Sequence, residues 1–291
     1  MPTAPPRPTA PPAARPAAPP ARPRSLILSF YGAFVRRLGG WVAVADLLAV
    51  MAEVGLDEQA VRSSVSRLKS RGWLIPERRD GAPGYALSDP ARAALAAGDE
   101  RIYGPGEPAD LADGWLIVVF SVPEAQRADR HVLRSRLTWL GLGSDASGVW
   151  IGPYRLLPAT RSMLESLRLH RYVDLFHADY AGFDDAARLV VRCWDLDRLR
   201  SLYADFVAVQ RPVLRAATRG TADVRAFTGY LTALDQWRGL PFLDPGLPRE
   251  LLPGGWEGAA AAAVFAGLTD ALAEPAYRHV RTVAGRNGSR R

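Results

Sequence analysis

Along the N-terminal third of the chain, apolar residues recur at helical spacing, and short apolar runs between them are typical of strands. The spacing predicts helices over 25–38, 45–54, 58–71 and 89–97. Strands are predicted at 41–42, 73–75 and 85–87. The last two strands flank residues 78–84, where Asp-Gly and Pro-Gly pairs predict a hairpin turn. Helices followed by a hairpin in this order predict a winged helix-turn-helix.

The predicted helix at 58–71 has one apolar side and one basic side. Asp57 is a good N-cap, Glu58 suits the first turn, and Gly72 ends the helix. The apolar stripe consists of Ala60, Val61, Val65 and Leu68. The other side carries no acid after Glu58, and a slim basic helix with small hydroxyl residues suits the major groove of DNA.

The predicted DNA contacts fall into two sets. Four side chains of the helix are expected to reach base edges: Arg62, Ser63, Ser66 and Arg67. Phosphates are expected to be held by Lys69 and Ser70 on the helix and by Arg78 and Arg79 at the hairpin tip. Basic surface helices also occur in proteins that bind no DNA, so the alternative is a winged helix that contacts another protein.

In the middle of the chain, strands alternate with amphipathic helices. Strands are predicted at 115–120, 148–151 and 172–180, and helices at 126–140 and 160–169. The residues of the first helix expected to face inward are Val132, Leu133, Leu137 and Leu140. This alternation predicts a ferredoxin-like domain.

From Asp195 onward the apolar residues return to helical spacing, over 195–209, 224–237 and 256–273, with a proline-rich bend before the last helix. The predicted fold class is α+β. The predicted segments are a disordered Pro/Ala/Arg-rich tail (1–24), a winged helix domain (25–103), a linker (104–112), a ferredoxin-like domain (113–192), a helical C-terminal effector and dimerisation domain (193–284) and a basic tail (285–291).

The charge of the chain does not by itself indicate a nucleic-acid partner. The formal net charge of the 291 residues is +7, but arginines in 1–24 and 286–291 account for the whole excess and leave 30 basic residues against 30 acidic ones. The single cysteine, Cys193, excludes an internal disulfide and a multi-cysteine zinc site, which suits a reducing cytoplasm. The apolar run at 258–268 is too short to span a bilayer.

Motifs for catalysis or metal binding are weak throughout the sequence. Residues 141–148 miss the dinucleotide-binding spacing, and Ser66-Arg67-Leu68-Lys69 matches Ser-x-x-Lys without its partner motifs. The histidines show no two-His metal spacing: His131, His170, His177 and His279. Two acidic pairs are interpreted as helix-start residues: Asp184-Asp185 and Asp195/Asp197. We therefore predict no enzyme, no metal site and no bound cofactor.

Several segments resemble the PaaX-like family, repressors of phenylacetic acid catabolism operons. The matching segments are VRSSVSRL (61–68) with GWL (72–74), FSVPE (120–124), LTWLGLG (137–143), GVWI (148–151), and WRGLPFLDPGLP (237–248) with LLP (251–253) and Trp256. The resemblance implies a cytoplasmic dimer that holds promoter DNA until an aryl-CoA thioester, typically phenylacetyl-CoA, releases it.

The resemblance also implies a middle domain similar to the small CRISPR-associated ribonuclease fold. Those nucleases use an acid at the end of their first strand. Here that strand ends in Phe120-Ser121-Val122, so we expect a scaffold without nuclease activity. A metal-dependent RNA nuclease built on this domain is the alternative function.

An aryl-CoA effector needs cations for its phosphates and an apolar slot for its ring. The candidate effector-binding residues lie in the C-terminal domain: Arg225, Phe227, Tyr230, Trp237, Arg238, Phe242, Arg249 and Trp256. The alternative is that the aromatic residues are core and the arginines are surface residues.

Overall fold

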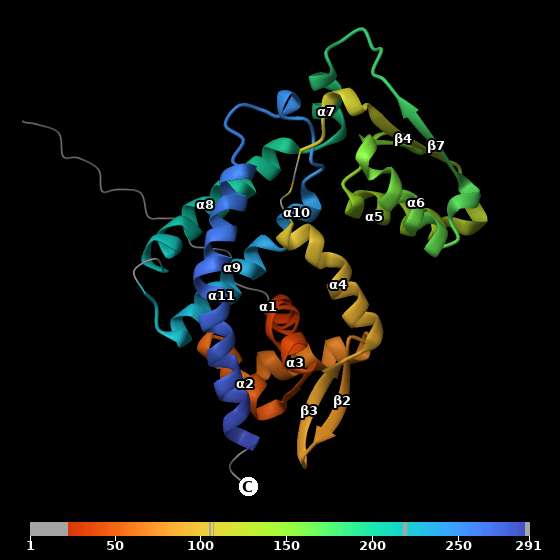
Figure 1. The fold of residues 1–291 in the computed structure, drawn as a ribbon. Helices are drawn as coiled ribbons and strands as arrows, with labels where there is room; N and C mark the ends of the chain where they lie inside the picture. The colour runs from red at the N-terminus through yellow and green to blue at the C-terminus, as the bar shows by residue number, and fades with distance from the viewer. Residues whose placement is uncertain (1–22, 105, 107, 218–219, 289–291) are drawn as a thin grey trace, which may run out of the picture.

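The computed structural model describes residues 23–104, 106, 108–217 and 220–288 of the chain. It is an α+β protein with two small antiparallel sheets (Figure 1). Most of the predicted N-terminal tail lies outside the described residues. The last two residues of that predicted tail, Pro23 and Arg24, instead form the start of the first helix. Proline is favoured in the first turn of a helix.

The N-terminal part contains helices around a three-stranded sheet. Its elements are α1 (Pro23–Phe30), a π-helical turn η1 (Tyr31–Val35), a 3-10 turn η2 (Arg36–Leu38), β1 (Trp41–Ala43), α2 (Val44–Glu53), α3 (Glu58–Ser70), β2 (Leu74–Arg79), β3 (Ala82–Leu87) and α4 (Asp89–Tyr103). Gly39 and Gly40 end η2 with positive φ, as their position predicts. Helix α4 continues six residues beyond the predicted end, because Ile102 and Tyr103 pack against the C-terminal helices.

The hairpin turn is shorter than predicted. The sheet order is β1-β3-β2, and β2 pairs with β3 up to Arg79 opposite Ala82. Asp80 and Gly81 alone form the connection, with φ of 48° and 76°, because two positive φ values match the twist of the flanking strands. The predicted turn at 78–84 is therefore wrong, and Arg78 and Arg79 belong to strand β2.

The middle part is a four-stranded sheet covered by helices. Its elements are β4 (Trp115–Phe120), α5 (Arg127–Leu140), β5 (Gly143–Ala146), β6 (Val149–Pro153), α6 (Leu157–Ser166) and β7 (Val173–Ala178). The order is β5-β6-β4-β7, with all neighbours antiparallel. Strand β5 was not predicted, because its sequence is polar and lies at an edge. Val132 is 38% exposed, not buried as predicted, whereas Leu133, Leu137 and Leu140 are buried.

The C-terminal part is helical, as predicted. Its helices are α7 (Ala186–Cys193), α8 (Leu196–Ala217), α9 (Asp223–Trp237), α10 (Leu240–Leu243) and α11 (Gly258–Gly288). Short 3-10 turns elsewhere are η3 (Leu111–Asp113), η4 (Glu124–Gln126), η5 (Tyr154–Leu156), η6 (His170–Tyr172) and η7 (Arg249–Leu251). Helix α11 extends past the predicted end at 273 and through Pro275, because Ala276 and Val280 are buried in the core.

The N-terminal and C-terminal parts share one hydrophobic core. Phe30 and Phe34 pack against Phe227 of α9, with ring centroids 6.2 and 5.5 Å apart. Helix α1 is surrounded by α2 and α3, α4, and the pair α9 and α11 (Figure 1). The two terminal parts of the sequence are therefore one packed body.

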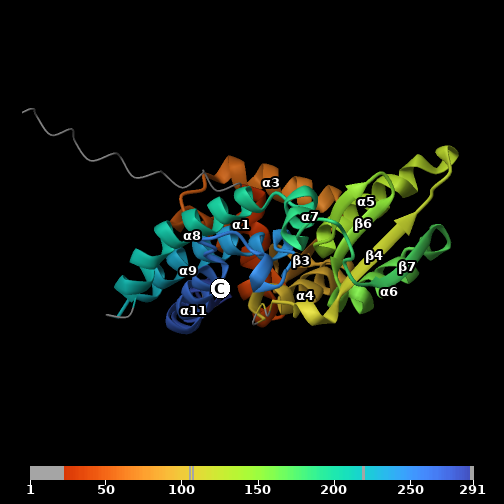
Figure 2. The same cartoon turned by 90° about the horizontal axis from the view of Figure 1, so that it is seen from above.

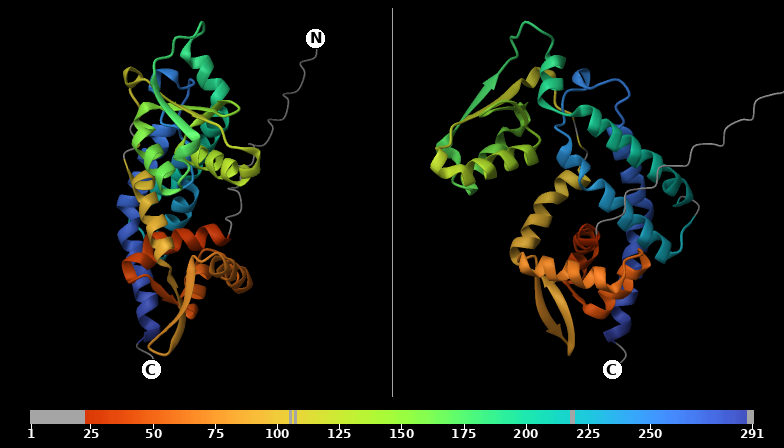
Figure 3. Two further views of the ribbon diagram at one scale, coloured as in Figure 1. Left: turned by 90° about the vertical axis from the view of Figure 1, so that its right-hand side faces the viewer. Right: turned by 180° about the vertical axis from the view of Figure 1, so that it is seen from behind.

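The four-stranded sheet lies beside that body and has its own core (Figure 2). A second cluster joins its other face to the C-terminal part: Trp115 and Ile151 of the sheet pack with Leu189 and Val190 of α7 and with Leu247. Figure 3 shows α3 and the β2–β3 hairpin at one end of the molecule and the four-stranded sheet at the other.

Arg101 of α4 ties the three parts together. Its Nε donates to the carbonyl of Pro241 at 2.8 Å, and its Nη1 donates to those of Trp139 and Leu140 at 3.3 and 3.2 Å. Its Nη2 donates to the carbonyl of Asp244 at 3.1 Å. Burial lowers the pKa of Arg101 because it disfavours the charged form of the guanidinium. The carbonyl oxygens offset part of this cost by accepting hydrogen bonds from the charged group.

Candidate nucleic-acid interface

Helix α3 is anchored by its apolar side. The Asp57 carboxylate accepts from the backbone N–H of Ala60 at 2.7 Å, which confirms the predicted N-cap. Val61, Val65 and Leu68 are buried in the shared core. Packing on this side fixes which side of the helix faces outward.

The basic face of α3 is open to solvent. It consists of Arg62, Ser63, Ser66, Arg67, Lys69 and Ser70, all exposed. Arg62 Nε donates to Glu58 at 2.6 Å, and Arg67 Nη2 donates to Ser63 Oγ at 3.2 Å. Both contacts lie on the surface, where ion pairs are weak, so both guanidinium groups can exchange them for a phosphate or a base edge.

The sequence interpretation missed Arg71, which is exposed at the C-cap of α3. It lies four residues after Arg67, and residues four apart are neighbours on a helix surface. That spacing is the signal that would have added Arg71 to the basic face.

The two hairpin arginines, Arg78 and Arg79, are not where the sequence predicted them, and they differ from each other in exposure and contacts. Neither is at the tip, which Asp80 and Gly81 occupy. Arg78 is exposed and donates to the carbonyl of Gly81 at 2.6 Å. Arg79 is half-buried, pairs with Glu77 at 2.6 Å and lies over the Trp41 ring at 5.4 Å.

Gly84 of β3 lets the Trp41 side chain cross the sheet. A Cβ at Gly84 would lie 2.4 Å from the Trp41 ring and 2.5 Å from the carbonyl oxygen of Val42. The Trp41 indole N–H donates to the Glu77 carbonyl on β2 at 3.2 Å. The hairpin is therefore held against β1 by a side chain that spans all three strands.

The candidate effector residues are not gathered into one site. Phe227, Tyr230 and Trp237 are buried in the shared core, and the Trp237 N–H donates to the Ile102 carbonyl at 2.8 Å. Arg225 and Arg249 are exposed on different elements. Phe242 stacks on Trp139 with centroids 5.0 Å apart, and Trp256 packs edge-on to Tyr203.

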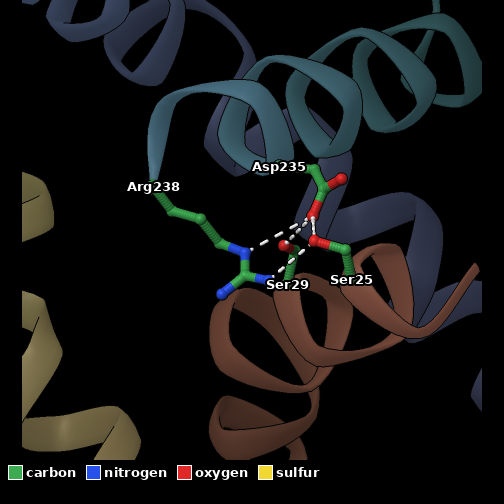
Figure 4. A network of polar contacts seen from close by, with 4 residues as sticks. All are labelled: Ser25, Ser29, Asp235 and Arg238. Atoms are coloured by element: carbon green, nitrogen blue, oxygen red, sulfur yellow. Dashed lines mark hydrogen bonds and ion pairs between the residues drawn. The ribbon is translucent and has the colours of Figure 1, made fainter. Parts of the chain in front are cut away.

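Arg238 belongs to a polar network between α1 and the end of α9 (Figure 4). Ser25 and Ser29 donate to Asp235 Oδ1 at 2.7 and 2.8 Å. Arg238 donates to that same Asp235 oxygen at 3.4 Å and to Ser25 Oγ at 2.7 Å. These bonds attach α1 to α9 at the edge of the shared core.

The acidic pairs interpreted as helix starts are in those positions. Asp185 accepts from the backbone N–H of Ala187 at 3.0 Å, and Asp195 from that of Arg198 at 3.1 Å. Among the described residues, no group of three or more His, Cys, Asp or Glu side chains is placed to hold a metal ion. Within the same residues, no helix has the length and apolar character needed to cross a membrane.

The Cys193 thiol is expected to react slowly. Burial, reinforced by the Asp145 carboxylate, raises the pKa of Cys193 to about 12. Because the thiolate is the nucleophile, iodoacetamide at about pH 8.5 should alkylate the folded chain at least about tenfold more slowly than the urea-unfolded chain. Intact-mass spectrometry over time measures both rates. Equal rates would show that the thiol is not held in a desolvated environment.

Comparison with known proteins adds three findings. Family models match successive parts of the chain: "PaaX-like protein" at 22–91, "PaaX protein central Cas2-like domain" at 108–190 and "PaaX-like protein C-terminal domain" at 194–282. The chain is 29% identical over 240 residues to the transcriptional repressor PaaX of Escherichia coli (strain K12), covering 80% of this chain and 75% of that protein. The uncharacterized protein Rv0674 from Mycobacterium tuberculosis has a similar fold, with a TM-score of 0.55 and 23% identity over 90% of this chain and 99% of the other.

Proposed function

Because the chain belongs to the PaaX-like family, we propose that it is a transcriptional repressor that binds double-stranded DNA through α3 and the β2–β3 hairpin. The observation that carries the proposal is the basic face of α3, which is exposed along its length while the opposite side is buried in the core. A helix anchored in this way can enter a major groove while the rest of the protein stays folded.

The order of elements supports a winged helix-turn-helix at 25–103. Helices α2 and α3 are joined by a short turn at Gly55, and the two-stranded hairpin follows α3 directly. In this arrangement Arg62, Ser63, Ser66 and Arg67 contact bases, while Lys69, Ser70 and Arg78 contact phosphates. Arg79 has only a supporting role, because its guanidinium is already paired with Glu77 and lies over the Trp41 ring.

The strand order β5-β6-β4-β7 supports a ferredoxin-like middle domain. If the four strands of this sheet are numbered 1 to 4 along the chain, their order across the sheet is 2-3-1-4. A helix follows the first strand and another follows the third, which is the split βαβ arrangement. We assign this domain a scaffolding role beside the body formed by the other two parts, because β4 ends at Phe120 without an acid. For the bounds of the linker and of the domains we keep the predictions made from the sequence.

The proposal includes an effector. An aryl-CoA thioester of the phenylacetyl-CoA type would release the repressor, which would act as a homodimer in the cytoplasm, where promoter DNA lies. The family resemblance supports this part of the proposal.

The DNA-binding proposal is tested by selecting a preferred sequence from a random duplex library and measuring its affinity for wild type and variants. Arg67→Ala should weaken binding to the selected duplex by about 1–3 kcal/mol if Arg67 contacts a guanine. Arg62→Ala should weaken it as well. Arg188→Ala is the matched control, since Arg188 is an exposed arginine on α7 paired with Asp184.

Salt dependence separates DNA binding from the alternatives. Affinity should fall steeply with salt, because each phosphate contact releases a condensed counterion. Unchanged affinity in both Arg62→Ala and Arg67→Ala would contradict the assignment of α3. An absence of duplex binding at low salt would favour a protein-interaction module, and metal-dependent turnover of labelled RNA would favour the nuclease.

A further inference from the structure

A cleft of about 400 Å³ lies where the DNA-binding part meets the C-terminal helices. The η1–η2 segment forms one wall, including Phe34, Arg36 and Arg37. Tyr103 of α4, Tyr230 of α9 and Ala273 of α11 form the rest. Its volume falls within the range of about 300–1,000 Å³ that is usual for small-molecule sites.

The backbone of the first wall departs from a regular helix. Tyr31–Val35 is a π-helical turn between α1 and a 3-10 turn, and such turns are frequent at functional sites. Gly32 lies on this wall, where an added Cβ would meet only Leu95 at 3.6 Å, an ordinary contact. Packing therefore does not require a glycine here.

Two guanidinium groups of the cleft are held in place by carboxylates. Arg36 donates to the Gly32 carbonyl and, through Nη1 and Nη2, to Asp99, each at 2.8 Å. These bonds use three of its five N–H groups, and the other two have no acceptor among the described residues. Arg37 donates to Glu274 at 3.1 Å and lies 3.7 Å from the Tyr277 ring centre. Arg36 is thus fixed before any ligand arrives, whereas the exposed Arg37–Glu274 pair is a surface contact that a ligand can replace.

The opposite wall supplies two phenols. The Tyr103 and Tyr230 hydroxyls lie near each other. Burial raises the pKa of both groups, so both keep their protons near neutral pH. Tyr103 is 42% exposed and offers its ring to the cleft, whereas Phe34 and Tyr230 are 1% and 4% exposed and lie mainly in the core. The cleft therefore combines an aromatic wall with hydrogen-bond donors and with two arginines, each paired with a carboxylate.

We propose that this cleft binds the aryl-acyl end of the effector, with the aromatic ring against Tyr103 and the acyl oxygen toward Arg36 and Arg37. This inference rests on the proposed ligand-responsive repressor. An aromatic carboxylic acid and its thioester share this chemistry. The nucleotide end of a thioester would extend out of the cleft, because a CoA group far exceeds its volume.

The walls of the cleft connect directly to the DNA-binding surface. The η1–η2 wall leads through Gly39 and Gly40 into β1, which pairs with β3 of the hairpin. Tyr103 is the last residue of α4, the helix that follows β3. A ligand that moves η1–η2 relative to α4 would therefore shift the hairpin relative to the rest of the protein.

The test compares wild type with Ala273→Leu, which places a larger side chain in the cleft on a helix that tolerates leucine. Ala208→Leu is the matched control, because Ala208 is exposed on α8. The probes are phenylacetate, phenylacetyl-CoA and acetyl-CoA, added to the full chain in calorimetric titrations and melting experiments. A bound ligand raises the melting temperature of the folded state.

Phenylacetyl-CoA, phenylacetate or both should bind wild type and Ala208→Leu alike, and Ala273→Leu at least tenfold more weakly. Acetyl-CoA, which lacks the ring, should bind far more weakly than phenylacetyl-CoA. The two aryl probes show whether the free acid or the thioester is the ligand. A second variant, Arg37→Met, should weaken binding without filling the cleft.

Equal aryl-ligand affinity in wild type, Ala273→Leu and Arg37→Met would overturn the assignment of the cleft, as would binding of neither aryl probe to wild type. The duplex assay is independent of both results. Ligand-free Ala273→Leu should bind the selected duplex like wild type, so a misplaced cleft and a wrong assignment of α3 give different outcomes.

Discussion

Replacing Phe227 by alanine should lower the free energy of unfolding by about 3–5 kcal/mol, because a fully buried phenylalanine leaves a large cavity. Its ring contacts Phe30 and Phe34, so the loss falls on the contact between the N-terminal part and the C-terminal helices. Urea denaturation followed by circular dichroism gives the change in free energy.

The control for this variant is Phe183→Ala. Phe183 is fully exposed, so its removal should change stability by less than about 0.5 kcal/mol. The shared core also predicts that α1–α3 and α8–α11 unfold in one transition. Two separated transitions in the wild-type protein, assigned by hydrogen exchange to these two parts, would contradict a common core.

Replacing Arg101 by methionine should cost about 2–4 kcal/mol of stability, because three part-buried carbonyls lose their donor and a buried acceptor left unpaired costs about 1–3 kcal/mol. Methionine keeps much of the apolar stem, so the change removes chiefly the guanidinium, together with its contact over the Phe242 ring. Since its four acceptors lie at the end of α5 and around α10, the middle sheet should also become looser relative to the helical body.

Arg188→Met is the comparison for Arg101→Met, since Arg188 is exposed and its ion pair with Asp184 is a surface contact. Hydrogen exchange at α5 and α10 should increase in Arg101→Met and stay unchanged in Arg188→Met. If Arg101→Met is as stable as Arg188→Met, the four carbonyls find other donors and Arg101 does not join the parts.

The sequence predicted elements whose signals are local. The Asp57 cap, the Gly39-Gly40 break and the buried stripe of α3 follow from side-chain type and spacing, and the structure confirms them. The ends of α4 and α11 could not be predicted from side-chain type and spacing, because contacts with residues distant in the sequence keep these ends helical. Ile102 and Val280 are ordered by contacts with the C-terminal body, which no local pattern records.

The site was predicted unevenly for the same reason. The basic face of α3 is a pattern within one helix, so six of its members were found, and Arg71 was missed at the boundary. The cleft brings together η1–η2, α4, α9 and α11, which are distant in the sequence. Only Tyr230 of its lining had been proposed for the effector, because the sequence alone does not show which arginines approach it.

The contact of Phe34 with Phe227 bears on how the chain is made. Nearly two hundred residues separate the two rings, so the ribosome completes the whole N-terminal part long before its core partner leaves the exit tunnel. Until then Phe30 of α1 and Phe34 of η1 lack their cover, and a nascent or truncated chain is open to chaperones and proteases. Prematurely terminated products should therefore be degraded before they can compete for the operator.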